Sequence, residues 1–327
     1  MKRFPVKVIS TQASEVLQVR FFPTDICNYD CSYCFAGSKD AVYRYPKDVD
    51  ILIKNFQILF DYYKDNFNKT KFRLEIAGGG EPTMWPSLDL FCKRLKDVYN
   101  VHITIVSNGS RTIRWWEDNS KYFDRAILSC HHEFVDIAHF VQVADLLFEA
   151  GSDVTALALM DAEHWDKCIA NIDYMQTSKH PWYIQAKVIV DAPGKDNNAY
   201  SPEQQAYITN ALKRIPTSDW LFPRMHELNL HNSVVLFDDD STIVAQAQTI
   251  LLNRWNGFYG WKCKIGFESI SIDASGVLKA SCGLSMFTKE LNIFAPNFKI
   301  ENAPTDIACT NALCSCQPDT HATKVRP

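Results

Sequence analysis

The stretch ICNYDCSYCF, residues 26–35, brings together three cysteines, Cys27, Cys31 and Cys34, in a C-x3-C-x2-C pattern. With this spacing, one short loop can surround a single inorganic centre. Three thiolates are one too few for a closed four-ligand zinc site, and one too few to bind every iron of a four-iron cluster. The pattern therefore predicts a centre with one metal position left for a ligand that is not protein.

The composition of the chain is that of a globular protein. Its 327 residues suffice for one large domain or a domain with an appendage, and 46% of them are apolar, enough for a sizeable core. The formal net charge is −4 and there is no long basic run, so we expect no nucleic-acid partner. The longest acidic run, Asp238–Asp240, is interpreted as a solvated turn rather than a metal site.

The cysteine count indicates metal or redox chemistry in a reducing compartment. Met1–Arg3 is basic, but no apolar segment of a secretory signal follows it, and no apolar run reaches about 18 residues. We therefore expect no export and no membrane partner. Without export, eleven cysteines argue against a disulfide framework, and an odd number cannot pair completely. We expect a cytoplasmic location.

Strand-like apolar runs alternate with amphipathic stretches through the first 190 residues. The predicted strands are Leu17–Pro23, Phe72–Ala77, Val101–Val106, Arg125–Ser129, Val154–Met160 and Tyr183–Val190. The predicted helices lie near Val49–Asn66, Ser87–Tyr99, Arg114–Tyr122, Phe134–Ala150 and Ala162–Thr177. Six successive βα units predict an α/β fold whose parallel sheet curves into a partial (βα)6 TIM-like barrel. Ligands bind at the carboxyl ends of the strands in such sheets, and the motifs below fall there.

The remainder of the chain breaks this alternation. Asp191–Asn198 is rich in turn formers and is interpreted as a linker or loop. Beyond it we expect a helix, a short β segment at Ser233–Phe237 and another helix from about Ile243. We therefore predict a barrel over residues 1–192 and a linker and helical, pocket-shaping region over 193–256. A small C-terminal auxiliary domain, cysteine-rich and built on a β-hairpin, is predicted over 257–327.

The cysteine motif follows directly after the first predicted strand, and Tyr33 stands just before its third cysteine. This arrangement resembles the radical S-adenosylmethionine (SAM) superfamily, whose hallmark is C-x3-C-x2-C after the first barrel strand. The resemblance implies that Cys27, Cys31 and Cys34 hold a 4Fe-4S cluster, and that SAM chelates its fourth iron. The alternatives are buried inert cysteines and structural zinc, which usually uses paired C-x2-C knuckles that are absent nearby.

The resemblance also implies an activity. In that superfamily the reduced cluster delivers one electron to the SAM sulfonium and the C–S bond breaks homolytically. The resulting 5′-deoxyadenosyl radical abstracts hydrogen from a substrate C–H bond. The cofactor supplies the difficult chemistry, while the protein positions it and excludes competing reactions. The partners implied are the substrate and a one-electron donor such as flavodoxin or ferredoxin.

A glycine run, AGGGEPT at Ala77–Thr83, stands at the end of the second predicted strand. Glycines let the backbone approach a ligand closely, although such a run alone usually marks a tight turn. At this place it resembles the GGE motif of radical SAM enzymes. The resemblance implies that Gly79, Gly80 and Glu81 bind the SAM amino group, and a carboxylate facing an ammonium is chemically apt.

Polar residues follow the third and fourth predicted strands. Ser107 and Asn108 end the third, where capping of a helix or turn is the alternative. Ser129 stands at the end of the fourth. In similar proteins such residues approach the SAM ribose or carboxylate, and the resemblance implies that role here. Lys187 is a charge within the last apolar strand, which is costly unless paired, so we assign it contact with SAM or the substrate.

The fourth strand runs on into Cys130–Glu133, with the sequence CHHE. Adjacent histidines usually point apart and no H-x3-H spacing is present. A role in the substrate pocket, in supporting metal ligands, or in the structure alone is therefore preferred to direct metal binding. Cys130 is a candidate hydrogen-atom donor, because we expect it near the mouth of the barrel. Cys92 and Cys168 lie on predicted helices and are interpreted as packing residues.

Five further cysteines near the C-terminus predict a second centre: Cys263, Cys282, Cys309, Cys314 and Cys316. The first two flank a predicted hairpin with its turn near Ala274–Gly276. Four thiolates can close a structural zinc site, but beside a radical SAM barrel the arrangement resembles the SPASM/twitch extensions, which carry auxiliary 4Fe-4S clusters. Five cysteines suffice for one such cluster, so the shorter twitch type matches better. The preferred ligands are Cys263, Cys282, Cys314 and Cys316, with Cys309 as the alternate.

Together these features predict a radical SAM oxidoreductase or maturase-type enzyme that oxidises, cross-links or epimerises its substrate. Twitch relatives act on sugars and related small molecules and SPASM relatives largely on peptides, so both substrate classes stay open. Only about 16 residues precede the first predicted strand, so we expect no N-terminal peptide-recognition domain. The alternative is a non-catalytic zinc or iron–sulfur protein with two cysteine-stapled sites, which the Gly79–Glu81 motif disfavours.

Overall fold

A parallel sheet forms the centre of the computed structural model, which describes residues 3–34, 45–189, 200–213, 233–314 and 317–327. Its order is β12-β11-β2-β3-β4-β5-β6-β7, and every neighbouring pair from β11 to β7 is parallel. Six of these strands are β2 (Val16–Phe21), β3 (Lys71–Ile76), β4 (Val101–Ser107), β5 (Arg125–Cys130), β6 (Asp153–Met160) and β7 (Tyr183–Val188). All six coincide with predicted strands within about two residues, and the prediction of an α/β fold with a parallel sheet is confirmed.

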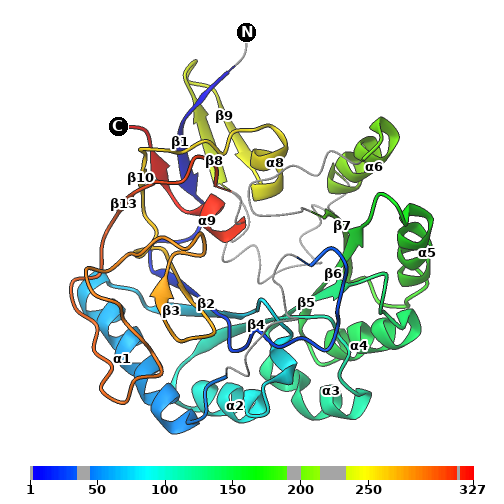
Figure 1. Ribbon diagram of the computed structural model, residues 1–327, viewed down its shortest axis with the longest axis horizontal. Helices are drawn as coiled ribbons and strands as arrows, with labels where there is room; N and C mark the ends of the chain where they lie inside the picture. The colour runs from blue at the N-terminus through cyan, green and yellow to red at the C-terminus, as the bar shows by residue number, and fades with distance from the viewer. Residues whose placement is uncertain (1–2, 35–44, 190–199, 214–232, 315–316) are drawn as a thin grey trace.

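Five helices lie along the outer side of this sheet (Figure 1). They are α1 (Val49–Phe67), α2 (Leu88–Val98), α3 (Ile113–Asn119), α4 (Ile137–Glu149) and α5 (Trp165–Met175). Side chains fix three of their starts, because Asp48, Thr112 and Asp136 accept hydrogen bonds from first-turn N–H groups. Each helix follows a predicted one closely, and two short 3-10 turns, Pro82–Met84 and Ser120–Tyr122, complete this layer.

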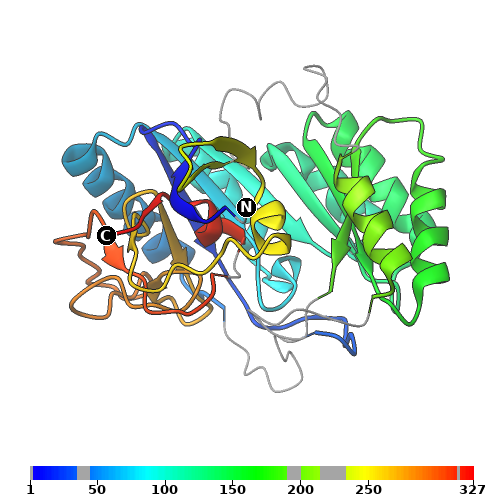
Figure 2. The ribbon, with the colours of Figure 1, turned by 90° about the horizontal axis from the view of Figure 1, so that it is seen from above.

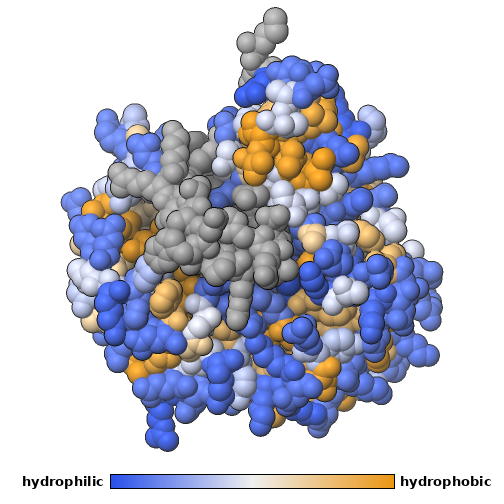
Figure 3. Space-filling model, turned by 180° about the vertical axis from the view of Figure 1, so that it is seen from behind, coloured by the Kyte–Doolittle hydropathy of each residue, from blue (hydrophilic) through white to orange (hydrophobic). Residues whose placement is uncertain are grey.

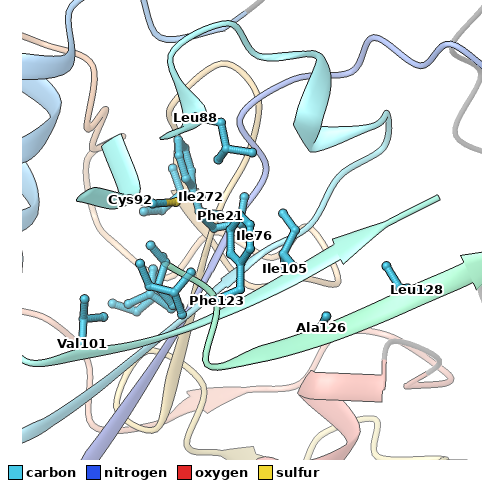
Figure 4. Close-up of a cluster of buried hydrophobic side chains, with 14 of the residues drawn as sticks. Phe21, Ile76, Leu88, Cys92, Val101, Ile105, Phe123, Ala126, Leu128 and Ile272 are labelled. Atoms are coloured by element: carbon cyan, nitrogen blue, oxygen red, sulfur yellow. The ribbon is translucent and has the colours of Figure 1, made fainter. Parts of the chain in front are cut away.

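Aromatic side chains fill the space between β2, α1 and α2. The Phe21 ring lies 5.6 Å from that of Phe56 and 5.7 Å from that of Phe91, and all three side chains are fully buried. Figure 4 shows Phe21 beside Ile76 and Ile272, its neighbours on the two flanking strands. Burial of such rings drives folding and holds the carboxyl ends of the first strands in place.

The C-terminal hairpin extends the parallel sheet. Strand β11 (Ser269–Ile272) pairs with β2 in parallel, and β12 (Leu278–Lys279) pairs with β11 in the antiparallel direction. Gly276 in the turn has φ +87°, a conformation that favours glycine. The hairpin prediction is thus confirmed, but its place beside β2 was not foreseen.

A second, antiparallel sheet lies beside the first, in the order β13-β10-β14-β1-β8-β9. Its strands are β1 (Pro5–Ser10), β8 (Ser233–Phe237), β9 (Thr242–Ala245), β10 (Lys262–Cys263), β13 (Ile307–Ala308) and β14 (Lys324–Val325). The cysteine-rich segment lies at the β2 end of the molecule, while α4, α5 and α6 (Pro202–Lys213) lie at the β7 end (Figure 2). Ile9 of β1 and Val244 of β9 are exposed apolar side chains. Figure 3 shows apolar patches on the face seen from behind, among a largely hydrophilic surface.

Two local expectations need correction. The helix predicted from Ile243 is strand β9, and helix α8 (Ala247–Leu252) begins only at Ala247. The turn at Asp238–Asp240, which was foreseen, reverses the chain so that Thr242–Ala245 pairs with β8, and this cross-strand pairing overrides local preference. Strand β1 also forms ahead of the first predicted strand, where no element was expected. The predicted loop Asp191–Asn198 lies outside the described residues.

The helices that the structure describes include none that combines the length and the apolar character needed to cross a membrane.

Candidate functional site

The cysteine loop follows β2 and lies over the carboxyl ends of β3, β4 and β5. Its first turn is fixed by the Thr24 hydroxyl, which accepts from the Ile26 N–H at 3.1 Å. The Ile26 carbonyl in turn accepts from the Glu81 N–H at 2.7 Å, and the Cys34 N–H donates to the Cys31 carbonyl at 3.0 Å. The backbone therefore sets the position of the loop before any cluster is considered.

The glycine run makes this close approach possible. A Cβ atom on Gly80 would lie 2.1 Å from the Ile26 carbonyl oxygen, and one on Gly78 would lie 3.1 Å from that of Thr24. Only glycine lets the two backbone segments meet in this way. The run thus has a packing role that the sequence did not reveal, while SAM binding by Gly79 and Gly80 stays a prediction.

Glu81 ties the ends of β3 and β4 together. Its side chain is only 2% exposed. Oε1 accepts from the Thr83 hydroxyl at 2.7 Å and the Ser107 hydroxyl at 2.8 Å, and Oε2 accepts from the Asn108 N–H at 2.7 Å. Burial raises the pKa of Glu81, and these hydrogen bonds oppose the rise. The predicted SAM-site residues Glu81, Ser107 and Asn108 are therefore in mutual contact, although their contact with SAM stays a prediction.

Asn108 continues this network to the cysteine loop. Its Nδ2 lies 4.0 Å from the Cys27 sulfur and donates to Asn28 Oδ1 at 2.9 Å. The Asn28 amide donates to the Ser110 hydroxyl at 2.9 Å, and the Tyr29 N–H donates to the Cys27 sulfur at 3.4 Å. N–H groups directed at a cysteine sulfur stabilise its thiolate and tune the potential of a cluster bound there.

His131, at the end of β5, contacts the second cysteine. Its Nδ1 lies 3.3 Å from both the Cys31 sulfur and the Tyr33 hydroxyl, and its ring stacks on Tyr33 with centroids 6.0 Å apart. Burial lowers the pKa of His131 to about 4, helped by the charges of His132 and Lys187, so its imidazole is neutral at pH 7. Burial raises the pKa of Cys31 to about 12. A bound iron ion would reverse that effect by stabilising the thiolate.

Glu133 holds the loop from the same side. Its carboxylate accepts from the Ser32 N–H at 2.8 Å and also from the Ser32 hydroxyl. Although desolvation opposes it, these two hydrogen bonds lower the pKa of Glu133. The sequence left open a place in the substrate pocket, support of metal ligands or a purely structural role for the CHHE stretch, and it did not identify Ser32 as the partner of Glu133.

The other predicted residues lie further from the loop. Ser129 is half-buried in β5, and the half-buried Lys187 of β7 stands opposite Leu159 of β6. Cys130 is 2% exposed within the hydrophobic core, and burial raises the pKa of its thiol to about 12. Its role as a hydrogen-atom donor stays a prediction. Cys92 and Cys168 are buried in the core, as expected of packing residues.

A pocket of about 210 Å³ opens beside the cysteine loop. Its lining residues are Tyr29, Asn108, Gly109, Ser110, Phe134, Val135, Asp136, His139 and Phe140. His139 lies on α4, and its Nε2 is 2.9 Å from the Arg111 carbonyl and 3.2 Å from that of Gly109. Sequence reasoning missed His139 and Ser110. The serine follows directly after Ser107-Asn108-Gly109, and that position was the available signal.

Four of the five C-terminal cysteines line one pocket. The residues of this pocket include Cys263, Cys282, Cys309, Cys314, Asp319 and Lys324. Cys316 lies outside the described residues, so its role as a cluster ligand stays a prediction. Cys309, the alternate ligand of the prediction, lies with the three preferred cysteines that the structure describes.

Lys324 places a buried positive charge beside this pocket. It is 1% exposed, and its Nζ donates to the Asp319, Thr320 and Ala322 carbonyls, at 3.0 Å for Ala322. Although burial opposes it, the neighbouring Cys263 and Cys314 raise the pKa of Lys324. A fixed ammonium favours anionic sulfur nearby, as in a thiolate-bound centre.

Both cysteine sets fit iron–sulfur clusters in their donor chemistry. Three thiols occupy the N-terminal loop, with two N–H groups directed at that of Cys27, and four thiols with a buried ammonium line the C-terminal pocket. Each thiolate of a four-iron cluster binds a different iron, so these sulfurs need not converge on one point as the ligands of a single ion do.

Residues 21–133 match the family model described as the Radical SAM superfamily. This segment is therefore a radical SAM domain, and it includes the cysteine loop, the glycine run and the ends of β3, β4 and β5. Members of that superfamily are enzymes.

Two curated relatives match short segments. The S-adenosylmethionine-dependent nucleotide dehydratase of Thermoplasmatales archaeon (strain ISO4-H5) is 35% identical over 91 residues, which are 28% of this chain and 28% of that protein. The GTPase Obg of Brachyspira hyodysenteriae (strain ATCC 49526 / WA1) is 27% identical over 113 residues, 33% of this chain and 16% of that protein. The matches span less than a third of either relative.

Solved structures resemble a larger share of the chain. Polyhistidine-tagged anSMEcpe with bound AdoMet (SAM) has a TM-score of 0.52 and 17% identity, covering 85% of this chain and 78% of that one. Native anSMEcpe with bound AdoMet gives a TM-score of 0.51 at 17% identity, with the same coverage. At this identity the likeness shows the fold alone. The family match supports SAM binding.

Proposed function

We propose that this chain is a radical SAM enzyme that cleaves SAM reductively and abstracts a hydrogen atom from its substrate. One observation carries the proposal. The C-x3-C-x2-C loop of the radical SAM domain is held at the carboxyl edge of a parallel sheet by the ends of three successive strands. A loop fixed in this way can present three thiolates and leave one metal position facing the substrate side.

Cys27, Cys31 and Cys34 would hold the 4Fe-4S cluster. When bound, this cluster supplies the electron that converts SAM to methionine and the 5′-deoxyadenosyl radical. The residues proposed to hold SAM are Tyr33, Gly79, Gly80, Glu81, Ser107, Asn108, Ser129 and Lys187. Because Glu81 already accepts hydrogen bonds from β4, we propose that its first task is to keep the strand ends in register around SAM.

Protein groups around the loop would also limit side reactions. The neutral His131 and Tyr33 shield the Cys31 sulfur, and Asn108 and the Tyr29 N–H donate to the Cys27 sulfur. Placement determines which C–H bond reacts, since the radical attacks what lies nearest. The pocket beside Tyr29 and Asn108 is the space we assign to SAM or to part of the substrate.

We propose a second, auxiliary 4Fe-4S cluster in the C-terminal pocket. Cys263, Cys282, Cys309 and Cys314 line that pocket, and Lys324 supplies a compensating charge. We also propose that the parallel sheet is a partial (βα)6 barrel and that residues 257–327 form a twitch-like auxiliary domain. The auxiliary cluster would accept the electron of a substrate radical or bind the substrate.

The substrate that we propose is a small molecule or a peptide that is oxidised, cross-linked or epimerised. A nucleotide dehydratase by name stands among the relatives, and one anSMEcpe structure holds a peptide, so each class has a precedent in a similar protein. The electron would come from a flavodoxin or ferredoxin. Deuterium transfer from a labelled candidate substrate into 5′-deoxyadenosine identifies the class.

Anaerobic reconstitution with iron and sulfide tests the proposal. The wild-type chain is expected to hold about eight irons, enough for two four-iron clusters, and to form 5′-deoxyadenosine from SAM with dithionite. Replacing Cys27, Cys31 and Cys34 by Ala should abolish SAM cleavage and leave about four irons in the C-terminal site. Cys92→Ala changes a cysteine in the core and outside both sites and is the matched control. It should retain the full iron content and the cleavage of SAM.

Two outcomes of the reconstitution would contradict the proposal. Zinc occupancy without SAM cleavage would favour the alternative, a non-catalytic protein with two cysteine-stapled sites. Loss of all iron in the triple alanine variant, with the fold intact by circular dichroism, would contradict the two-cluster proposal.

A further inference from the structure

Two histidines and an aspartate meet at the carboxyl ends of β5 and β6. His132 follows β5, Asp161 follows β6 directly, and His164 immediately precedes α5. In the part of the chain that the structure describes, they form the one group of three possible metal-ligating side chains whose ligand atoms all lie within 4.8 Å of one another. This group is separate from both cysteine sites.

One carboxylate oxygen stands between the two imidazoles. Asp161 Oδ2 lies 3.3 Å from His132 Nε2 and 2.8 Å from His164 Nδ1. The other oxygen, Oδ1, accepts from the Glu163 N–H at 3.0 Å, which fixes the rotation of the carboxylate. The two rings face each other, with centroids 5.0 Å apart and planes inclined by 27°. The three side chains are therefore oriented as a compact set of donor atoms.

The buried ring of His132 is a second, independent argument for a metal site. Its side chain is only 2% exposed, yet neither ring nitrogen makes a hydrogen bond, although Nε2 is close enough to Asp161 for an ion pair. Buried polar groups in proteins almost always have hydrogen-bond partners. An imidazole buried in this state beside a carboxylate and a second imidazole has the surroundings of a metal ligand.

We propose that His132, Asp161 and His164 bind a divalent transition metal ion of the zinc type. Two imidazoles and one carboxylate are ligands that zinc and related ions accept. Three protein ligands leave a coordination position open for water or an oxygen atom of the substrate. The His164 side chain is half exposed, so the group can be reached from solvent.

The site adjoins the cysteine loop without sharing a ligand with it. The Tyr33 ring stacks on His132 with centroids 5.4 Å apart, and the same ring stacks on His131, which contacts Cys31. The metal would therefore lie at the same edge of the sheet as the proposed cluster. The inference does not rest on the proposed function, because the ligands belong to neither cysteine set.

Zinc loading of the iron-reconstituted, full-length chain tests the inference. After dialysis against Zn²⁺, one zinc per chain is expected in addition to an unchanged iron content. X-ray absorption at the zinc edge should show nitrogen and oxygen ligands at about 2.0–2.2 Å, and not sulfur at about 2.3 Å. Iron does not interfere at this edge, and sulfur would reveal zinc in a cysteine site.

Variants assign the ligands. Asp161→Asn and His164→Asn should each weaken zinc binding more than about 100-fold, beyond the 10–100-fold typical of groups around a ligand. His180→Asn removes a histidine that pairs with Glu149 outside the proposed metal group, and should leave zinc affinity unchanged. His164 is exposed enough that its variant should fold, which circular dichroism and iron content will check.

Absence of zinc, sulfur ligation, or a zinc affinity of the Asp161 and His164 variants equal to that of wild type would each overturn the metal assignment. The group would then be a His164–Asp161 hydrogen bond with His132 beside it. Zinc bound as expected in a chain that does not cleave SAM would contradict the proposed function alone.

Discussion

Gly80 is the residue at which the glycine run and the cysteine loop meet. Gly80→Ala would place a Cβ atom 2.1 Å from the Ile26 carbonyl oxygen and 2.5 Å from the Asp25 carbonyl carbon. Both neighbours are backbone atoms, so the loop has to move. We expect reconstituted iron to fall from about eight to about four per chain and SAM cleavage to drop more than about tenfold, since a cluster needs all its thiolates in place.

Iron analysis and 5′-deoxyadenosine formation measure this effect. Gly257→Ala is the matched control, because the nearest atom to its added Cβ is 3.9 Å away. If Gly80→Ala kept full iron and normal SAM cleavage, the position of the cysteine loop would not depend on this contact.

At the residue scale, the sequence could reveal only what is close together in the chain. The three cysteines and the glycine run are local patterns, and both were recognised. The hydrogen bonds from Asn28 to Ser110 and from Ser32 to Glu133 join residues 82 and 101 positions apart, and such pairs leave no periodic signal. The group of His132, Asp161 and His164 was missed for the same reason, since its members follow two different strands.

The hairpin of β11 and β12 depends on one aspartate. Asp273 Oδ1 accepts from the Ser275 and Val277 N–H groups at 2.9 Å and 3.0 Å, and Oδ2 pairs with Lys279 at 2.6 Å. Partial burial opposes the shift, but the hydrogen bonds from Lys279, Ser275 and Val277 lower the pKa of Asp273. The carboxylate therefore stabilises the turn that joins the two strands.

A pH dependence follows from this lowered pKa. The contribution of Asp273 is fully present above its unfolded pKa of about 3.9 and is lost as pH falls through the lower folded value. We expect Asp273→Ala to lower the free energy of unfolding at pH 7 by about 1–3 kcal/mol. The difference from wild type should shrink below about pH 4 as the carboxyl group becomes protonated.

Urea unfolding at several pH values measures the difference. Asp306→Asn changes an exposed aspartate of the same C-terminal segment and serves as control. A difference between wild type and Asp273→Ala that is the same at pH 3 and pH 7 would show that the charge of Asp273 does not stabilise the hairpin.

Elements with long or strongly apolar patterns were predicted well, as was the five-residue strand β8, whereas the strands of two residues in the second sheet were not. The six parallel strands and five outer helices were found because each buries a regular face. Strands β10, β13 and β14 have only two residues each, too few for a pattern. Strand β1 does alternate, in PVKVIS, and could have been found, but its partners β8 and β14 are remote in sequence.

At the scale of the whole molecule, the C-terminal segment is joined to the first half of the sheet. Besides the pairing of β11 with β2, the buried Asn55 of α1 donates to the Ile293 and Ala295 carbonyls at 2.7 Å and 2.8 Å. The Tyr62 hydroxyl accepts from the Ala303 N–H at 3.0 Å. The two cysteine sites therefore stand on one continuous framework, a relation that no local pattern in the sequence contains.

This framework makes a prediction about truncation. A chain that ends at residue 256 would expose the edge of β2, uncover part of the Phe21 cluster and leave Asn55 of α1 without its carbonyl partners. An unpaired strand edge and a buried amide without acceptors both destabilise the fold. We expect the truncated chain to lose its cooperative thermal transition and to bind no stable iron at Cys27, Cys31 and Cys34.

The matched control is the double variant Cys263→Ala and Cys314→Ala, which removes proposed ligands of the auxiliary cluster but keeps β11 beside β2. It should retain about four irons and the cleavage of SAM, because the loop after β2 keeps its support. Calorimetry, iron analysis and 5′-deoxyadenosine formation compare the two chains. If the truncated chain unfolded cooperatively and cleaved SAM at the rate of the double variant, the first half of the sheet would be independent of the C-terminal segment. The pairing of β11 with β2 would then be an attachment rather than a support.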